Sequence, residues 1–292
     1  MDIAKYKVTG KRKINLADFK TNDAGEMKRS KEIEELTEKN KNEFSEFQDK
    51  FFAEAKGALL IIIQAMDAAG KDGAIKHVMS GINPQGVNVH SFKQPSAEER
   101  SHDYLWRAIK VLPPRGKIAI FNRSYYETVL IEKVHKDYLY LNLPDRCKTD
   151  DTIEKRYGHI RDFERYLWDN GTTIVKLFLH LSEETQRKRF LKRIEEKDKN
   201  WKFSASDLQE RKYWKEYQKA FETAINETST DVSPWYVIPA DKKWYSRLVI
   251  SEILLDVIKK MDPRYPVVPE GHEAALEECR KLLTEQHKDK DA

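Results

Sequence analysis

The sequence predicts an α/β fold in which helices cover both faces of one parallel sheet of about five strands, a three-layer α/β/α arrangement. Short, nearly continuous apolar runs alternate with segments of helical periodicity. Such runs are typical of strands that are buried on both faces. With 292 residues, the chain is long enough to build a sizeable core. The predicted strands are 58–64, 87–92, 117–121, 172–181 and 235–238.

The segments between these strands are predicted to be mostly helical. Polar residues dominate 1–28, which we expect to form an irregular arm that packs on the domain. From 29 to 56, apolar side chains recur at helical spacing and predict one long amphipathic helix. An amphipathic tail at 270–287 is expected to pack on the outside. The other predicted helices are 96–112, 123–135, 150–169, 182–198, 206–228 and 242–261.

No internal repeat or low-complexity linker interrupts this pattern, so we predict a single domain over 1–292. We expect 1–56 to form the arm and the long helix, and 266–292 to form the amphipathic tail. The core is predicted at 57–265, with a helical lid at about 182–214.

Composition narrows the classes of function. Charged residues make up 35% of the chain, but the net charge is only +4, so any basic site must be local. Cys147 and Cys279 are far apart and no Cys or His pair has zinc-ligand spacing, which favours a reducing compartment without a structural metal. The first residues lack the apolar core of a signal peptide, and the longest apolar run, Ala58 to Ile63, is too short to span a bilayer. We therefore expect a soluble cytoplasmic protein with no membrane partner.

The stretch "LLIIIQAMDAAGKDGAIKHV" at 59–78 predicts a strand, a phosphate-binding loop and a helix. It departs from the pattern G-x-x-x-x-G-K-[ST] at Ala65, in place of the first glycine, and at Asp72, in place of the hydroxyl. In such a loop, backbone N–H groups and the helix N-terminus converge on an anion, and Lys71 reaches its oxygens. An ordinary glycine turn is the alternative. The predicted phosphate-binding residues of the loop are Ala68, Ala69, Gly70, Lys71, Asp72 and Gly73.

Two carboxylates, Asp67 and Asp72, lie beside this anion site. Like charges repel there unless a cation lies between them, and Mg²⁺ accepts carboxylate and phosphate oxygens together. We therefore predict that Asp67 and Asp72 bind Mg²⁺, with Mn²⁺ as a possible substitute. Alternatively, Asp72 only stabilises the N-terminus of the following helix, where a negative side chain is favourable.

The stretch "NRSYYE" follows the strand 117–121, at the sheet edge where parallel sheets bind ligands. Asn122 stands where phosphate-loop enzymes usually place a metal-binding aspartate. Because Asn carries no charge, Glu127 would help Asp67 and Asp72 to neutralise the charge of the metal ion. Arg123 is placed to bind a phosphate with two hydrogen bonds, unless it forms a structural salt bridge.

The stretch "LSEETQRKRFLKRIEE" follows the fourth predicted strand. It carries five basic residues between Arg187 and Arg193, and no acid lies within that range. On a helix, such residues could close as a lid over a phosphate chain. The alternative is a solvated charged face. The predicted phosphate-binding residues of this helix are Arg187, Arg189 and Arg193.

Over about residues 10–265 the sequence resembles the polyphosphate kinase 2 family. The matching stretches are "QAMDAAGKDGAIKHVMSGINPQGV", "SFKQPSAEERSHDYLWR", "IFNRSYYE", "KNWKFSASDLQER" and "WYVIPADKKWY". The resemblance implies a P-loop kinase-like fold similar to thymidylate kinase, and magnesium-dependent transfer of phosphate between inorganic polyphosphate and nucleotides. It also implies a homo-oligomer.

The resemblance extends to individual positions. Asp67, Lys71 and Arg123 fall on positions that the family uses for metal and phosphate. Glu127 is similar to the class III branch, which phosphorylates AMP as well as ADP, although that branch commonly has His at the position of Tyr125. The expected catalytic residues are Asp67, Lys71, Arg123 and Glu127.

We expect polyphosphate to lie in a basic groove between the loop and the lid, with its end at Lys71. The acceptor phosphate is already anionic near neutrality, so the reaction requires charge neutralisation and positioning rather than a strong base. Because one phosphoanhydride replaces another, the reaction should be reversible among AMP, ADP and ATP. The predicted nucleotide-binding residues are Lys93, His102, Asp103, Arg107, Asn122 and Glu127.

Two other functions are compatible with parts of the pattern. A nucleoside monophosphate kinase that uses ATP would share the fold, but it should carry Ser or Thr where Asp72 stands. A nucleic-acid-binding module would need aromatic platforms beside the basic helix and a strongly positive domain, whereas the net charge is +4. We therefore expect no nucleic-acid partner.

Overall fold

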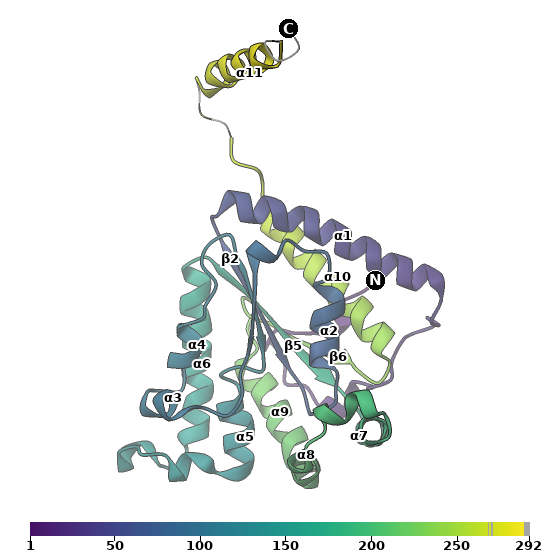
Figure 1. The fold of residues 1–292 in the computed structure, drawn as a ribbon. Helices are drawn as coiled ribbons and strands as arrows, with labels where there is room; N and C mark the ends of the chain where they lie inside the picture. Colours follow the sequence, from purple (N-terminus) through teal and green to yellow (C-terminus); the bar gives the residue numbers. More distant parts are fainter. Residues whose placement is uncertain (268, 270, 289–292) are drawn as a thin grey trace.

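The computed structural model describes residues 1–267, 269 and 271–288, and a single six-stranded sheet forms its centre. Figure 1 shows the sheet between two layers of helices, as the sequence predicts. The strand order is β1-β6-β5-β2-β4-β3, and every pairing is parallel except that of β1 with β6. The strands are β1 (Lys7–Val8), β2 (Ala58–Gln64), β3 (Val87–Ser91), β4 (Ile118–Asn122), β5 (Thr172–His180) and β6 (Trp235–Pro239).

The five predicted strands form the parallel part of the sheet. The sixth strand, β1, was missed because its two residues are too few to show a period. It belongs to the N-terminal arm, which also binds α9 (Trp214–Thr228) through the Leu16 N–H and Glu222 Oε2, 2.8 Å apart.

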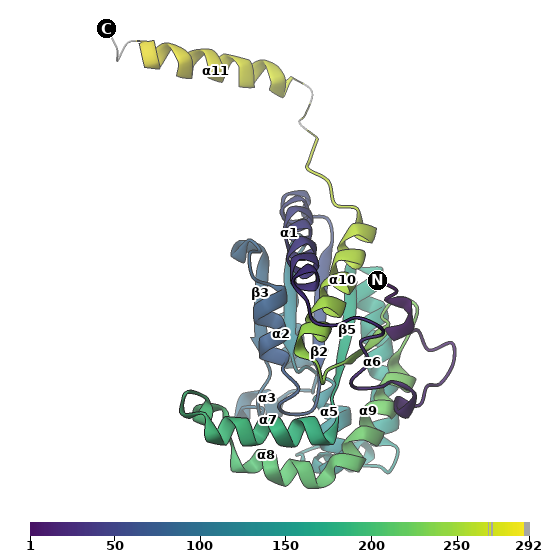
Figure 2. The ribbon, with the colours of Figure 1, turned by 90° about the vertical axis from the view of Figure 1, so that its right-hand side faces the viewer.

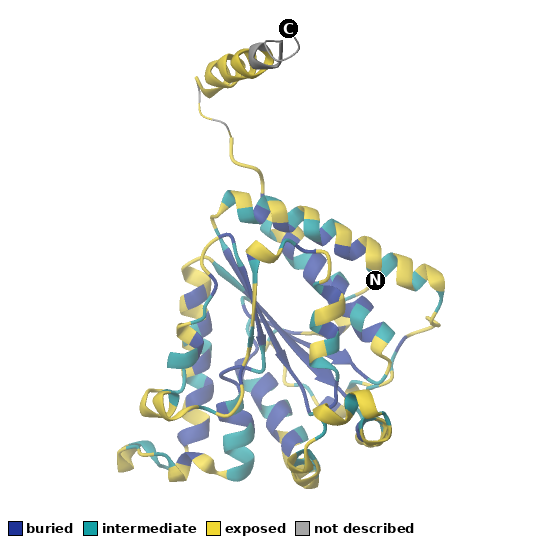
Figure 3. Ribbon diagram, in the orientation of Figure 1, coloured by how far each residue is buried: buried dark blue, intermediate teal, exposed yellow. Residues whose placement is uncertain are grey.

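Strand β2 lies at the middle of the core, and all seven of its residues are buried. Because successive side chains of a strand point to opposite faces, Ile61 packs toward α1, α2 and α10, and Ile62 packs toward α5, α6 and α9. Figure 3 shows the sheet buried and the outer helix faces exposed. The α-helices are α1 (Lys31–Glu54), α2 (Lys71–Val78), α3 (Ala97–Ser101), α4 (Trp106–Ile109), α5 (Glu127–His135), α6 (Thr152–Asp169), α7 (Glu183–Glu195), α8 (Ala205–Glu210), α9, α10 (Lys243–Met261) and α11 (His272–Lys288).

Three predicted helices differ from the structure. The predicted helix 96–112 is two short helices, α3 and α4. The backbone of His102 is extended, so the helix is interrupted at His102 and Asp103. The helix expected at 123–135 begins only at Glu127, because Arg123 has a left-handed backbone with φ 63°. The helix expected at 206–228 is divided by a 3₁₀ turn at Arg211–Tyr213.

The tail forms the predicted helix, α11, but it does not pack on the domain. Its described residues from 271 to 284 are all exposed, and Figures 1 and 2 show it apart from the body. The packing expected from its amphipathic pattern is therefore absent in the single chain. Among the described residues, no helix combines the length and the hydrophobicity that crossing a membrane requires.

The strand register brings the ends of three strands to one edge. Ile63 of β2 pairs with Asn122 of β4 on one side and with Leu177 of β5 on the other. The phosphate loop, the "NRSYYE" turn and the segment that leads into α7 therefore start side by side. Figure 2 shows α7 and α8 lying next to each other across this edge.

Candidate active site

The phosphate loop joins β2 to α2 and contains two left-handed residues, Ala68 (φ 61°) and Gly70 (φ 106°). Ala65, which replaces the first glycine of the pattern, is not among the residues with positive φ, so a side chain is tolerated there. Lys71 opens α2, and its Nζ donates to the carbonyls of Ala65 at 2.9 Å and Met66 at 3.3 Å. Lys71 is thus folded back onto the backbone of the loop, beside the predicted anion site.

Burial lowers the pKa of Lys71, and the neighbouring Asp67 carboxylate partly opposes this shift. The ammonium group therefore lies where little water screens it. An anion that replaces its two carbonyl partners would gain a strong charge-assisted interaction.

Both loop acids are paired with β4 or the turn that follows it. Asp67 Oδ1 accepts from Arg123 Nη2 at 2.6 Å, and Asp72 Oδ1 accepts from Asn122 Nδ2 at 2.8 Å. Helix α2 has no side-chain cap, so Asp72 is directed toward Asn122 rather than toward the helix end. Asn122 Oδ1 is buried without a hydrogen-bond partner in the described structure, so this edge retains an unused oxygen ligand.

Arg123 lies at the centre of the site in a strained backbone conformation. Its N–H donates to the Ile63 carbonyl at 3.0 Å, which fixes the turn to β2. Its Nη1 lies 3.6 Å from Glu127 Oε2. Burial raises the pKa of Glu127, and the positive charge of Arg123 opposes that rise. Backbone strain of this kind concentrates at functional sites, where surrounding contacts maintain it.

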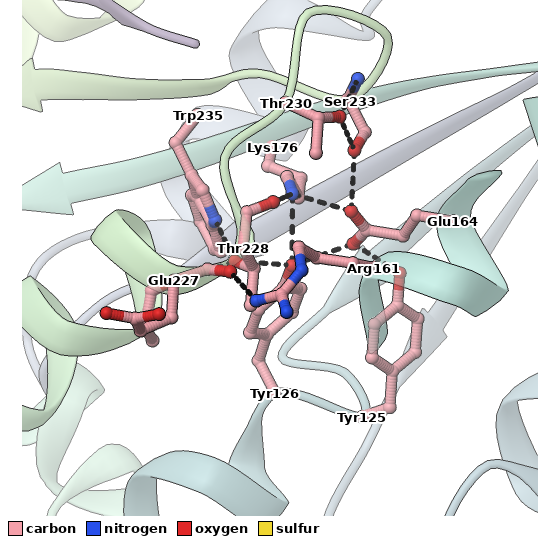
Figure 4. Close-up of polar contacts among 11 residues, drawn as sticks. Tyr125, Tyr126, Arg161, Glu164, Lys176, Glu227, Thr228, Thr230, Ser233 and Trp235 are labelled. Carbon is pink, nitrogen blue, oxygen red and sulfur yellow. Dashed lines mark hydrogen bonds and ion pairs between the residues drawn. The ribbon is translucent and has the colours of Figure 1, made fainter. Parts of the chain in front are cut away.

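A buried polar network holds the two tyrosines of "NRSYYE" (Figure 4). The hydroxyl groups of Tyr125 and Tyr126 donate to Glu164 Oε1 at 3.0 and 2.7 Å. Lys176 Nζ lies 2.6 Å from Glu164 Oε2, and both side chains are fully buried. Lys176 also donates to the Thr228 carbonyl at 2.8 Å. This network anchors the segment between Arg123 and Glu127, so the Tyr125 hydroxyl has a structural role where the class III branch commonly has His.

Helix α7 faces the loop with one side only. Arg189 Nη1 donates to the carbonyls of Ala68 and Ala69 at 3.0 and 2.7 Å, and its Nη2 donates to Ala240 and Asp241 at 2.7 and 3.1 Å. Arg193 lies 3.5 Å from Asp207 of α8.

The Arg187 side chain does not contact the phosphate loop. Its guanidinium pairs with Glu184 at 2.8 Å on the exposed side of the helix. Arg187 and Arg189 are two residues apart on a helix and therefore point in nearly opposite directions. Arg187 therefore does not line the same place as Arg189 in this structure, and its assignment to the phosphate chain stays a prediction.

A cavity of about 810 Å³, here called the loop cavity, opens between the phosphate loop, α7, α8 and α10. Ten Lys or Arg residues line it against three acids, Asp67, Asp72 and Asp207. Five of the ten were given no role in the site from sequence, although three of them lie in the stretches "KNWKFSASDLQER" and "WYVIPADKKWY". The five are Lys192, Lys199, Lys202, Lys243 and Arg247.

A second cavity of about 620 Å³, here called the flank cavity, lies between α3, α5, α6 and the segment 137–149. The predicted nucleotide-binding residues Lys93, His102, Asp103, Arg107 and Glu127 all line it. Asn122 instead lines the loop cavity. The two cavities share Phe92, Lys93, Gln94 and Arg123 in their walls.

Contacts inside the flank cavity show how its residues are held. Arg107 Nη1 donates to the Lys93 carbonyl at 2.8 Å. His102 stacks on Trp106 with centroids 3.9 Å apart, and Asp103 Oδ1 accepts from the Leu105 N–H at 2.9 Å. His102 and Asp103 thus stabilise the break between α3 and α4.

The far wall of this cavity was not predicted from the sequence. Tyr104, Thr152 and Arg156 line it, and the Tyr104 hydroxyl is buried without a hydrogen-bond partner among the described residues. Arg156 donates to the Thr128 carbonyl at 2.8 Å. Tyr104 lies in the stretch "SFKQPSAEERSHDYLWR". No quoted stretch contains Thr152 or Arg156, because they reach the cavity only through the packing of α6 on α5.

Comparisons with known proteins give the same family as the sequence motifs. The model of the family Polyphosphate kinase 2 matches residues 27–266. The chain is 49% identical to the ADP-polyphosphate phosphotransferase of Rhodopseudomonas palustris, over 85% of this chain and 87% of that protein. It is 42% identical to the AMP/ADP-polyphosphate phosphotransferase of Meiothermus ruber, over 90% and 95%.

A solved structure extends the comparison to the fold. The polyphosphate kinase 2 of Arthrobacter aurescens TC1 superposes with a TM-score of 0.86 at 37% identity, covering 96% of this chain and 95% of that one. The family match spans most of the chain, and the motifs that carry it surround the two cavities. This chain therefore belongs to the polyphosphate kinase 2 family.

Proposed function

We propose that the protein transfers the terminal phosphate of inorganic polyphosphate to AMP and ADP, and that the transfer is reversible. The observation that carries this proposal is the meeting of two cavities at Arg123, one strongly basic and one of mixed charge. Polyphosphate would lie in the loop cavity with its end at Lys71. The nucleotide would lie in the flank cavity with its phosphate directed toward Arg123.

The residues of this chain supply positioning and positive charge. Lys71 and Arg123 would neutralise the group in transfer, and Arg193 would neutralise the chain behind it. The acceptor phosphate has a second pKa of about 6, so the attacking oxygen is anionic near neutrality without a base. Glu127 then holds Arg123 by charge rather than removing a proton, which agrees with their separation of 3.6 Å.

The acid residues fit a divalent cation of the magnesium type. Asp67 and Asp72 offer carboxylate oxygens beside the anion site, and the unpartnered Oδ1 of Asn122 adds a neutral oxygen. In the described part of the chain, no three Asp, Glu, His or Cys side chains gather into a complete metal site, so phosphate and water oxygens would complete the shell. When bound, Mg²⁺ or Mn²⁺ would reduce the repulsion between the two anionic reactants.

The acceptor range rests on Glu127 and on the relatives. The Rhodopseudomonas relative is named for ADP alone, and the Meiothermus relative is named for AMP and ADP. Glu127 resembles the class III branch, so we assign both acceptors to this chain.

The test is to incubate the protein with polyphosphate, Mg²⁺ and either AMP or ADP, and to separate AMP, ADP and ATP over time. We expect AMP to give ADP and then ATP, and a chelator of divalent cations to stop both steps. Formation of ATP from ADP with no conversion of AMP would contradict the class III assignment. No conversion of either nucleotide would contradict the proposed reaction.

An ATP-dependent monophosphate kinase is the remaining enzymatic alternative, and Asp72 argues against it. Comparing ATP with polyphosphate as the donor to AMP separates the two reactions. The homo-oligomer stays a prediction, which light scattering of the purified protein tests. Cytoplasmic localisation and the absence of a nucleic-acid partner stay predictions as well.

A further inference from the structure

A third cavity, of about 470 Å³, lies beneath the N-terminal arm and is here called the arm cavity. Arm residues between 5 and 23 form one wall, and His180, Val237 and Pro239 form the other. His180 and Pro239 are the last residues of β5 and β6, so the cavity lies at the ligand-binding edge of the sheet. The neighbouring residue, Leu179, lines the loop cavity on the opposite face of the strand.

The arm cavity carries an excess of positive charge. Four cations line it, and two acids, Asp18 and Asp23, oppose them. Lys5 pairs with Asp23 at 3.0 Å, and Lys13 pairs with Glu227 at 3.1 Å. The other two cations, Arg12 and Lys20, have no ion-pair partner in the described ranges of the chain. Their charge is available to an anion.

His180 gives the cavity a polar floor. Its side chain is only 8% exposed, and its Nδ1 is buried without a hydrogen-bond partner among the described residues. Burial lowers the pKa of His180, so the ring is neutral near pH 7. A neutral ring nitrogen in this position lacks the partner that buried polar groups normally have. Ile14, Phe19 and Val237 add apolar surface around it.

We infer that the arm cavity is a second binding site, distinct from the active site, for a nucleoside phosphate. Arg12 and Lys20 would bind the phosphate groups, and the base would contact Phe19 and hydrogen-bond to His180 Nδ1. An inorganic phosphate chain could use the cations but has no apolar face for Phe19. The combination of basic rim, apolar side chains and the polar His180 floor therefore selects a nucleotide.

A short series of contacts joins this cavity to the active site. Thr21, next to Lys20, donates from Oγ1 to Asp241 Oδ2 at 2.8 Å. Asp241 Oδ1 accepts from the Ser182 N–H at 2.9 Å, where the segment enters α7. The Asp241 carbonyl accepts from Arg189, which also holds the phosphate loop. A nucleotide that binds Lys20 would therefore act on the lid base through Thr21 and Asp241, and so on the affinity for polyphosphate.

The test is a calorimetric titration of the full chain with ADP in the absence of polyphosphate. We expect two classes of site in the wild type. The double variant Arg12→Glu/Lys20→Glu should weaken one class by about tenfold or more, the effect expected for lost charge-assisted hydrogen bonds, and leave the other class unchanged. Lys7→Glu is the matched control, because Lys7 is an exposed arm cation outside the cavity.

Photolabelling with an azido-ADP and peptide mapping assigns each class to its cavity. We expect labelled peptides from 5–20 as well as from 93–107. Tripolyphosphate should compete for the arm class at least about tenfold more weakly than ADP does, and His180→Phe should remove that preference. The inference is overturned if the double variant binds like Lys7→Glu, if no label reaches the arm, or if tripolyphosphate and ADP compete equally. These readouts need no turnover, so they stand apart from the test of the proposed reaction.

Discussion

The loop cavity and the flank cavity meet at Arg123, yet they are built from different balances of charge. Ten Lys or Arg residues face three acids in the loop cavity, whereas seven face five acids in the flank cavity. The loop cavity therefore suits a long polyanion that has no other feature to recognise. The flank cavity suits a molecule with one small anionic group and a neutral remainder.

The two cavities are also held by different means. The phosphate loop is fixed through backbone carbonyls that bind Lys71 and Arg189. In the flank cavity Arg107 likewise binds a carbonyl, that of Lys93, but His102 is held by stacking on the side chain of Trp106. A substitution in the first should therefore affect every reaction of the enzyme, and one in the second should affect the nucleotide alone.

Lys71→Ala should produce the largest effect. Loss of a preorganised charge at the transferring group typically costs about 10²–10³ in turnover. We expect this loss with AMP and with ADP alike, and in ATP consumption as well, measured by nucleotide separation. Lys76→Ala, at an exposed position on the same helix, is the control. Turnover of Lys71→Ala within a few fold of the wild type would refute the placement of polyphosphate at this loop.

Arg189→Ala should be next in size. It removes the donor shared by four carbonyls, and unpaired buried groups cost about 1–3 kcal/mol each. We expect kcat/KM for polyphosphate to fall roughly tenfold to a hundredfold. Arg187→Ala is the matched variant on the exposed side of the helix, where a surface ion pair is worth about 0–1 kcal/mol. Equal losses in both variants would contradict the assignment of the loop contact to Arg189 alone.

Arg107→Ala should show a smaller and more selective effect. Loss of a charge-assisted contact near the acceptor should raise the KM for AMP and ADP about tenfold. The KM for polyphosphate should not change, because Arg107 lines only the flank cavity. Initial rates with each substrate varied in turn measure this, with the exposed Arg115→Ala as the control. A rise in the polyphosphate KM would break the distinction between the cavities.

Local chemistry explains which parts of the site could be predicted. The phosphate loop and "NRSYYE" each follow a buried strand directly, so their place at the sheet edge follows from the chain order. Ten residues of "SFKQPSAEERSHDYLWR" line the flank cavity, because they share one segment. Helical geometry could also have separated Arg187 from Arg189, since two residues turn a helix through about 200°.

Other parts required the folded chain. Lys243 and Arg247 come from α10, far along the sequence from the loop that they face. Tyr125 looked like a departure from the family, but its hydroxyl belongs to the buried Glu164–Lys176 network, which no spacing in the sequence reveals. The two-residue strand β1 was invisible because pairing with β6, rather than its own pattern, defines it.

The alkaline side of the pH profile gives the smallest and most specific prediction. Burial lowers the pKa of Lys71 below its ordinary 10.5, and only the charged form binds phosphate. As pH rises through that lowered pKa, kcat/KM for polyphosphate should fall. Bound phosphate restores the pKa upward, so the fall in kcat should occur at higher pH than the fall in kcat/KM.

This loss should not be confused with unfolding. Where the folded pKa of a lysine is below the unfolded one, the unfolded chain holds more protons between the two values, so this group makes the fold more stable as pH rises. Lys71→Arg keeps its charge throughout this range, so its residual activity should lose the alkaline fall. Circular dichroism across the same pH range checks that the fold is intact. If the variant kept the same alkaline limb, Lys71 would not be the titrating group, and the loop cavity would depend on another cation.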